Sequence, residues 1–278
     1  MEFFNQYSTA WLLGLAVALL ATGLVAGVLA GLLGVGGGIV IVPVLYHLFT
    51  LLGVDESVRM HAAVGTSLAT IIPTSIMSSR AHKKRGSLDM SLIKRLMPSV
   101  VVGVIVGSVA SRFLSGASLT AVFASIALLV ALNMAFKRDG FAVADGLPGP
   151  MGTALLGSGI GGVSTLMGIG GGTLSVPILN ALRVPMHTAV GTGAMLGMVI
   201  SFPGALAFIL NGLDVPNRLP FSLGYVNLLG FALIVPATLA TTGWGAKLAH
   251  AINAQRLRQV FALFLALTAA RMFYGLLT

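Results

Sequence analysis

The chain has 278 residues, of which 56% are hydrophobic and 8% charged, and its mean hydropathy is +0.99. A soluble domain carries about 25% charged residues, so this chain has too little charge to coat a surface that faces water. Apolar runs near the ~20 residues that cross a bilayer recur along its length. The composition therefore excludes a soluble globular protein and predicts an all-α polytopic membrane protein. The absence of cysteine also excludes disulfides and thiolate metal sites.

The apolar segments form two groups of five. The first group occupies 10–34, 38–53, 60–79, 96–114 and 118–136, and the second occupies 151–168, 172–182, 187–210, 221–243 and 257–277. A polar linker rich in glycine and proline separates them at 137–150. We expect an N-terminal transmembrane repeat over 1–136, an uncleaved first span included, and a C-terminal transmembrane repeat over 151–278. The segments 38–53 and 172–182 are short for a full crossing.

Two motifs recur in the same order in both halves. GVGGG at Gly34–Gly38 returns 134 positions later as GIGGG at Gly168–Gly172, each with a proline five residues after its last glycine. HxAVGT at His61–Thr66 returns 126 positions later at His187–Thr192. The double recurrence indicates an internal duplication. Five segments per half would make the two repeats inverted, an arrangement that transporters use for alternating access.

The basic residues indicate the orientation. The net charge is +9, and six of the 16 lysines and arginines lie between Arg80 and Arg95, in one short loop. Such clusters mark the cytoplasmic side, so we interpret the charge as a topology signal and expect no binding to nucleic acid. If all ten segments cross from an outside N-terminus, Arg183 and Lys247 are cytoplasmic too. If the two short segments re-enter the membrane without crossing it, Arg183 and Lys247 both lie outside, and the excess of basic residues on the cytoplasmic side becomes smaller.

The glycine runs predict a ligand site. Unwound backbone inside a bilayer survives only where it packs on protein or lines a polar cavity. A helix that starts after such a break presents unpaired N–H groups and a positive dipole end, which suits an anion. We expect these substrate-binding groups at Gly36, Gly37, Gly38, Gly170, Gly171 and Gly172. The alternative is that small residues only allow close helix packing.

The second motif supplies hydroxyls and imidazoles. Thr66, Ser67 and Thr192 could donate hydrogen bonds to a bound oxyanion, or each hydroxyl could bond back to its own helix. His61 and His187 could carry protons, or could simply be histidines at a helix end near the interface. Gly193 stands where the first half has Ser67, so the two half-sites differ chemically.

The remaining sequence argues against catalysis. All aspartates and glutamates fall in the expected loops or at the N-terminus, and no catalytic or metal-binding motif occurs. We therefore expect no enzyme, no metal and no cofactor. The lack of acidic residues in the spans favours an anionic or neutral substrate over a cation.

On the glycine-rich pattern and the following HxAVGT, present in both halves, the chain resembles the sulfite exporter TauE/SafE family, also called TSUP. The resemblance implies a carrier in the bacterial inner membrane that exports sulfite, organosulfonates or related sulfur-containing anions. Its partners would be this anion, the lipid bilayer and a second copy in a homodimer. An anion channel and a non-transporting membrane assembly protein are the alternative functions.

Overall fold

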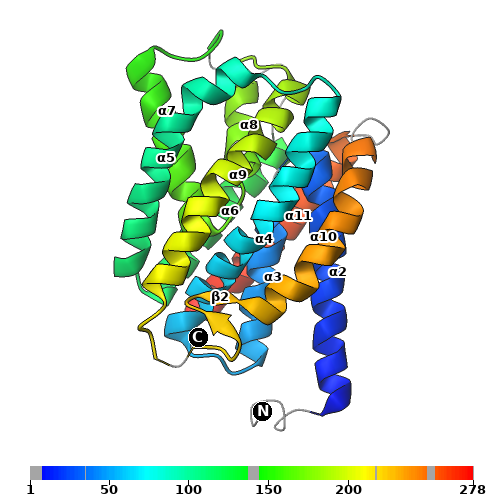
Figure 1. Ribbon diagram of the computed structural model, residues 1–278, viewed down its shortest axis with the longest axis vertical. Helices are drawn as coiled ribbons and strands as arrows, with labels where there is room; N and C mark the ends of the chain where they lie inside the picture. The colour runs from blue at the N-terminus through cyan, green and yellow to red at the C-terminus, as the bar shows by residue number, and fades with distance from the viewer. Residues whose placement is uncertain (1–7, 35, 137–143, 217, 249–253, 278) are drawn as a thin grey trace.

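The computed structural model describes residues 8–34, 36–136, 144–216, 218–248 and 254–277, which form ten α-helices and one two-stranded hairpin (Figure 1). The N-terminal half supplies α2 (Thr9–Leu33), α3 (Gly38–Leu51), α4 (Glu56–Lys84), α5 (Met90–Phe113) and α6 (Gly116–Phe136). The C-terminal half supplies α7 (Pro150–Met167), α8 (Gly172–Ala181), α9 (Met186–Asn211), β1 (Ser222–Leu223), β2 (Val226–Asn227), α10 (Leu228–Leu248) and α11 (Ala254–Leu277).

The helices are those of a multi-pass membrane protein. Six of the described helices are long and apolar enough to cross a bilayer, namely α2, α4, α5, α6, α9 and α10. Large apolar side chains such as Leu13, Val106 and Leu129 are more than half exposed, as expected for residues that face lipid. The predicted all-α polytopic class is confirmed.

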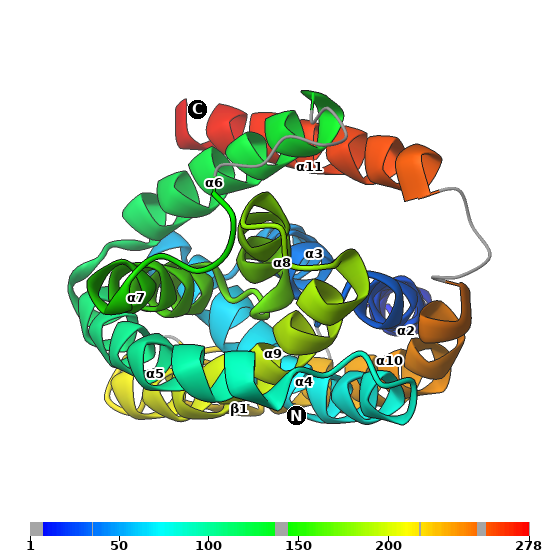
Figure 2. The same ribbon diagram turned by 90° about the horizontal axis from the view of Figure 1, so that it is seen from above.

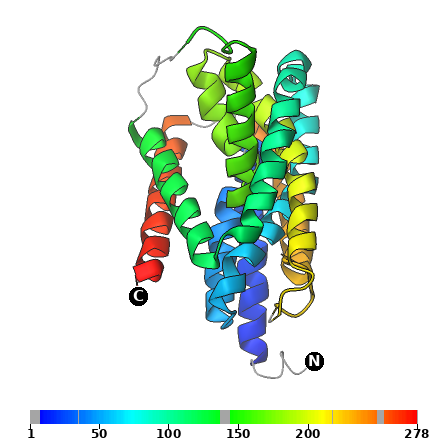
Figure 3. The same cartoon turned by 90° about the vertical axis from the view of Figure 1, so that its left-hand side faces the viewer.

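Successive helices alternate in direction along the long axis, and both described ends of the chain lie at the same end of the molecule (Figures 1 and 3). The short helices α3 and α8 follow this alternation. Their 14 and 10 residues span about 21 and about 15 Å at 1.5 Å per residue, less than the ~30 Å of a hydrocarbon core. Each short helix therefore begins inside the bundle, at a glycine run, and returns toward the end from which the preceding helix came.

The helix pairs are held by close backbone contact. The main pairs are α2 with α10, α5 with α7, α6 with α11, and α4 with α9. Seen from above, α3 and α8 lie in the interior, between the α6–α11 pair and a row formed by α5, α9, α4 and α10 (Figure 2). Small residues make this closeness achievable, as in other membrane bundles. A Cβ added to Gly23 of α2, for example, would lie 2.6 Å from the carbonyl oxygen of Ile234 in α10.

The two glycine breaks are built differently. Gly34, Gly36 and Gly37 have φ angles of 67°, 70° and 80°, in the left-handed region that other residues rarely adopt. In the second break only Gly168 has such an angle, 64°, and Gly171 is right-handed with φ −54°. The first break therefore needs glycine for its backbone conformation, whereas Gly171 needs it for space.

One helix starts later than the sequence predicts. The apolar segment 221–243 predicts a single span, but α10 starts only at Leu228, and the residues before it form the β1–β2 hairpin. Asn227 fixes this start, because its side-chain oxygen accepts a hydrogen bond of 2.8 Å from the Gly230 N–H at the first turn of α10. Its own N–H donates to Thr66 Oγ1 over 2.8 Å, which ties the hairpin to α4.

Candidate functional site

The two glycine breaks meet each other inside the bundle. A Cβ added to Gly38 would lie 2.5 Å from the carbonyl oxygen of Gly168, and one added to Gly36 would lie 3.5 Å from the Cα of Gly170. These glycines come from opposite halves of the chain and are fully covered by protein. The unwound backbone that the sequence predicts is thus placed where protein rather than lipid surrounds it.

Each break also contacts the HxAVGT helix of the other half. A Cβ on Gly168 would lie 2.8 Å from the Cα of Val64 in α4, and one on Gly34 would collide with Val190 in α9. Val64 and Val190 occupy the same position of the repeated motif. The structure therefore brings each glycine break against the second motif of the opposite half.

The three hydroxyls expected to bind substrate differ in their partners. Thr66 accepts the hydrogen bond from Asn227, and Ser67 Oγ donates to the Gly168 carbonyl over 2.7 Å. Thr192 Oγ1 is fully buried and has no hydrogen-bond partner within the described chain. Ser67 therefore uses its O–H on the Gly168 carbonyl, whereas Thr66 is engaged only as an acceptor. Since Thr192 has no partner within the described residues, the O–H groups of Thr66 and Thr192 are the two left for a ligand.

Further buried hydroxyls have no partner within the described residues, and some of them lie beside the breaks. A buried polar group left unsatisfied costs about 1–3 kcal/mol, so a group of them indicates water or a ligand. Within the described residues these hydroxyls, beside Thr192, belong to Ser75, Ser108, Ser164, Thr173, Ser175 and Ser201. Sequence reasoning missed Ser75, Thr173 and Ser175, although Thr173 and Ser175 follow the second glycine run directly.

The two repeated histidines are in unlike surroundings. His61 is buried, with Nδ1 3.2 Å from the Ser57 carbonyl oxygen and Nε2 3.2 Å from that of Ser111. Its ring stacks on Tyr225 at a centroid distance of 4.9 Å. His187 is exposed at the start of α9. A neutral imidazole has one N–H and can donate to only one of the two carbonyls at His61, whereas the protonated ring donates to both.

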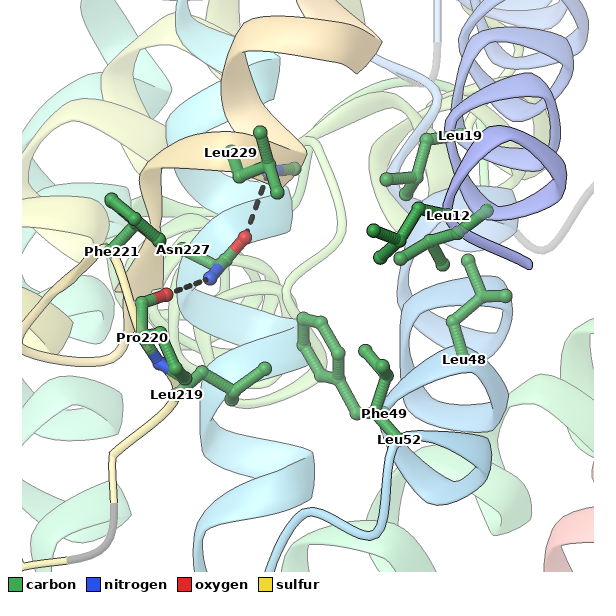
Figure 4. Close-up of a pocket in the computed structure, with 12 residues that line it drawn as sticks. Leu12, Leu19, Leu48, Phe49, Leu52, Leu219, Pro220, Phe221, Asn227 and Leu229 are labelled. Carbon is green, nitrogen blue, oxygen red and sulfur yellow. Dashed lines mark hydrogen bonds between the residues drawn. The ribbon is translucent and has the colours of Figure 1, made fainter. Parts of the chain in front are cut away.

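Two hollows lie away from the breaks. An apolar pocket of about 40 Å³ lies between α2, α3 and the hairpin, with Asn227 on its wall and leucines around it (Figure 4). The side-chain amide of Asn227 is bonded to the Pro220 carbonyl over 3.1 Å, so the wall offers no free polar group there. An open depression of about 580 Å³ lies at the opposite end, where Asp89, Arg183 and Thr188 lie among apolar residues in its lining.

The interior carries no fixed charge in the part of the chain that the structure describes. The buried polar residues there are serines, threonines, one asparagine and the histidines His61 and His82. No group of three or more histidine, cysteine, aspartate or glutamate residues within the described ranges could hold a metal ion. The breaks therefore offer a ligand only hydroxyls and backbone dipoles.

An all-helical bundle with lipid-facing sides, two broken helices that meet in the interior, and unpaired polar groups beside them defines a multi-pass membrane transporter rather than an enzyme. The family model described as "Sulfite exporter TauE/SafE" matches residues 19–272, and the chain belongs to that family.

Relatives in two bacteria and one archaeon support this assignment. A Haemophilus influenzae protein named "Probable membrane transporter protein" is 34% identical over 254 residues, which cover 91% of this chain and 96% of that protein. Similarly named proteins are 28% identical in Bacillus subtilis and 26% identical in Methanocaldococcus jannaschii, over 85% and 86% of this chain and 88% of each relative. No solved structure matches the chain.

Proposed function

We propose that this protein is a carrier that exports a small sulfur-containing anion, such as sulfite or an organosulfonate, across the bacterial inner membrane by alternating access. The observation that carries the proposal is the family match, because the family is described as a sulfite exporter and the match spans nearly the whole chain. The anion would bind where the breaks meet, near the N–H groups of Gly36–Gly38 and Gly170–Gly172. Helix N-termini in such breaks suit anionic groups.

The helix packing supports two inverted repeats, 1–136 and 151–278. In these repeats α2, α3, α4, α5 and α6 correspond in order to α7, α8, α9, α10 and α11. The contact of α2 with α10 then corresponds to that of α7 with α5, the contact of α4 with α10 to that of α9 with α5, and the contact of α3 with α4 to that of α8 with α9. All of these pairs are in contact. The α6–α11 and α4–α9 pairs convert into themselves. The helices α2 and α7 run in opposite directions (Figure 3), as inversion requires.

The basic residues support a cytoplasmic assignment for the end that carries the open depression. Lys83, Lys84, Lys94 and Arg95 are exposed at that end, beside the α4–α5 connection. Arg183 belongs to the depression and pairs there with Asp145 at 2.7 Å. Along α9, Thr188 lines the depression and Thr192 lies one turn deeper, fully buried.

Flux into and out of liposomes tests the proposal. The purified protein would be reconstituted in vesicles loaded with labelled taurine or sulfite, and efflux would be measured against protein-free vesicles. Saturable efflux that an excess of the same unlabelled anion inhibits is expected. Unitary currents in a planar bilayer would indicate a channel instead, and no flux with any sulfur-containing anion would contradict the transport function.

Proton coupling and self-association extend the proposal. His61 and His187 are the candidates for a proton-linked step, and His61 is favoured by the two carbonyl acceptors around its ring. A homodimer would give twice the mass of one chain in detergent-corrected light scattering. A monomeric mass across the working concentration range would contradict it.

A further inference from the structure

We infer that the anion is held at the N-terminus of α8 and not equally at the N-terminus of α3, and that it binds as a singly charged oxyanion. The inference rests on the proposed transport function and refines its site. It follows from two differences between the breaks, in space and in polarity, and from the absence of a counter-charge in the described interior.

The first difference is space above the helix start. The N-terminus of α3 is covered by Ile71 of α4, whose Cδ1 would lie 2.7 Å from a Cβ on Gly38 and whose Cγ2 would lie 2.9 Å from one on Gly36. The position equivalent to Ile71 in the second half, 126 residues later, is Gly197 of α9. A Cβ on Gly171 would lie 2.8 Å from the backbone nitrogen of Gly197. The backbone of Gly197, with the carbonyl carbon and Cβ of Leu196, therefore borders the start of α8, where the branched end of the Ile71 side chain covers the start of α3.

The second difference is polarity. Ser75 Oγ is fully buried without a partner among the described residues, and it would lie 2.5 Å from a Cβ on Gly197, beside the start of α8, and 3.4 Å from one on Gly36. On the other flank, Ser175 Oγ is equally buried and unpartnered, 3.0 Å from where a Cβ of Gly193 would lie.

The first turn of α3 lacks these groups. The residues 134 positions before Thr173 and Ser175 are Ile39 and Ile41, both fully buried. A helix start bordered by two unsatisfied hydroxyls can bind an anion with N–H and O–H donors together. The start of α3 shares Ser75 Oγ, which lies 3.4 Å from where a Cβ of Gly36 would lie, but its own first turn adds isoleucines and no hydroxyl.

The third feature is the absence of a counter-charge. No lysine or arginine is among the buried residues in the described ranges. The desolvation penalty of an ion grows with the square of its charge, and hydroxyls and helix dipoles offset only part of it. Such a site therefore favours one negative charge, as on a sulfonate or hydrogensulfite, over the two charges of sulfate or sulfite.

Ligand-dependent melting of the purified full-length protein tests both parts. The probes are methanesulfonate, sulfate and sulfite at equal ionic strength, with sulfite measured on the acidic and the alkaline side of its second ionisation. A ligand that binds only the folded state raises the melting temperature. Methanesulfonate is expected to stabilise at both pH values, sulfite mainly on the acidic side, and sulfate at neither.

Three serine variants locate the site. Ser75→Ala and Ser175→Ala are each expected to weaken the apparent Kd for methanesulfonate about tenfold or more, because each removes a hydrogen bond to a charged group. Their melting temperatures without ligand should not fall, since the hydroxyls lost have no partner in the part of the chain that the structure describes. Ser201→Ala is the matched control. Ser201 lies 126 positions after Ser75, at the equivalent place of the second half, and is also buried and unpartnered within the described residues. The Kd of this variant for methanesulfonate should equal that of the wild type.

The outcomes separate the two claims. If methanesulfonate and sulfite both bind the wild type but Ser201→Ala weakens them as much as Ser75→Ala does, the one-sided placement is wrong and the transport function stands. If sulfate binds as tightly as methanesulfonate, the single-charge inference is wrong. If no sulfur-containing anion stabilises the wild type, the proposed function is contradicted together with this inference.

Discussion

Ser67 Oγ donates a hydrogen bond of 2.7 Å to the carbonyl oxygen of Gly168, and this contact joins α4 of the first half to the glycine break of the second. Its counterpart cannot exist, because the equivalent residue on α9 is Gly193. The tether is therefore single and holds only the second break.

We expect Ser67→Ala to destabilise the protein. The change removes a buried hydrogen bond worth about 0.5–1.5 kcal/mol and leaves one acceptor of the Gly168 carbonyl unfilled. The melting temperature in detergent should fall, and Ser91→Ala, at an exposed serine of α5, should leave it unchanged. Equal melting temperatures for both variants would show that the tether contributes nothing to stability.

The α2–α10 contact predicts a sharp difference between two glycines of the same helix. A Cβ on Gly27 would lie 2.7 Å from the Cα of Thr238, whereas nothing lies within 4 Å of one on Gly14. Gly27→Val should therefore separate the helices and greatly reduce the yield of monodisperse protein, and Gly14→Val should not. Size-exclusion chromatography in detergent measures both, and a well-folded Gly27→Val protein would contradict this packing.

The surroundings of the histidines predict different pH responses. Protonation of His61 adds a donor between the Ser57 and Ser111 carbonyls, so a proton-linked step at His61 should disappear in His61→Gln. The comparison is the pH profile of efflux from liposomes, with His187→Gln as the control at an exposed site. A flattened profile in His61→Gln alone is expected. The same profile in all three proteins would exclude both histidines from the coupling.

The orientation can be tested on a single helix. The chain contains no cysteine, so each introduced cysteine is the only reactive thiol. Lys94 and Arg112 are exposed near opposite ends of α5. In intact cells a membrane-impermeant maleimide should label Arg112→Cys and not Lys94→Cys, and both should react after permeabilisation. The reverse pattern would invert the proposed topology.

The sequence predicted the helices far better than the partners of their polar groups. Each of the ten apolar segments corresponds to a helix, because glycine runs, prolines and charged loops mark the ends of the segments. The hairpin before α10 was missed because Phe221–Asn227 contains no charge to interrupt the apolar pattern.

The free hydroxyls could not be identified from spacing alone. Thr70 and Thr74 donate to carbonyls of their own helix at 2.7 and 2.8 Å, whereas Ser75 beside them does not. That choice depends on which face of α4 meets Gly197, a contact between helices more than 100 positions apart.

The packing of α6 against α11 has a consequence for how the protein assembles in the membrane during synthesis. The last helix of the first half packs chiefly on the last helix of the whole chain, and α2 packs on α10. During synthesis, two early helices therefore enter the bilayer long before the helices that cover them leave the ribosome. The N-terminal half must wait in the membrane incompletely assembled, and lipid or the insertion machinery has to occupy those faces until α10 and α11 have been made.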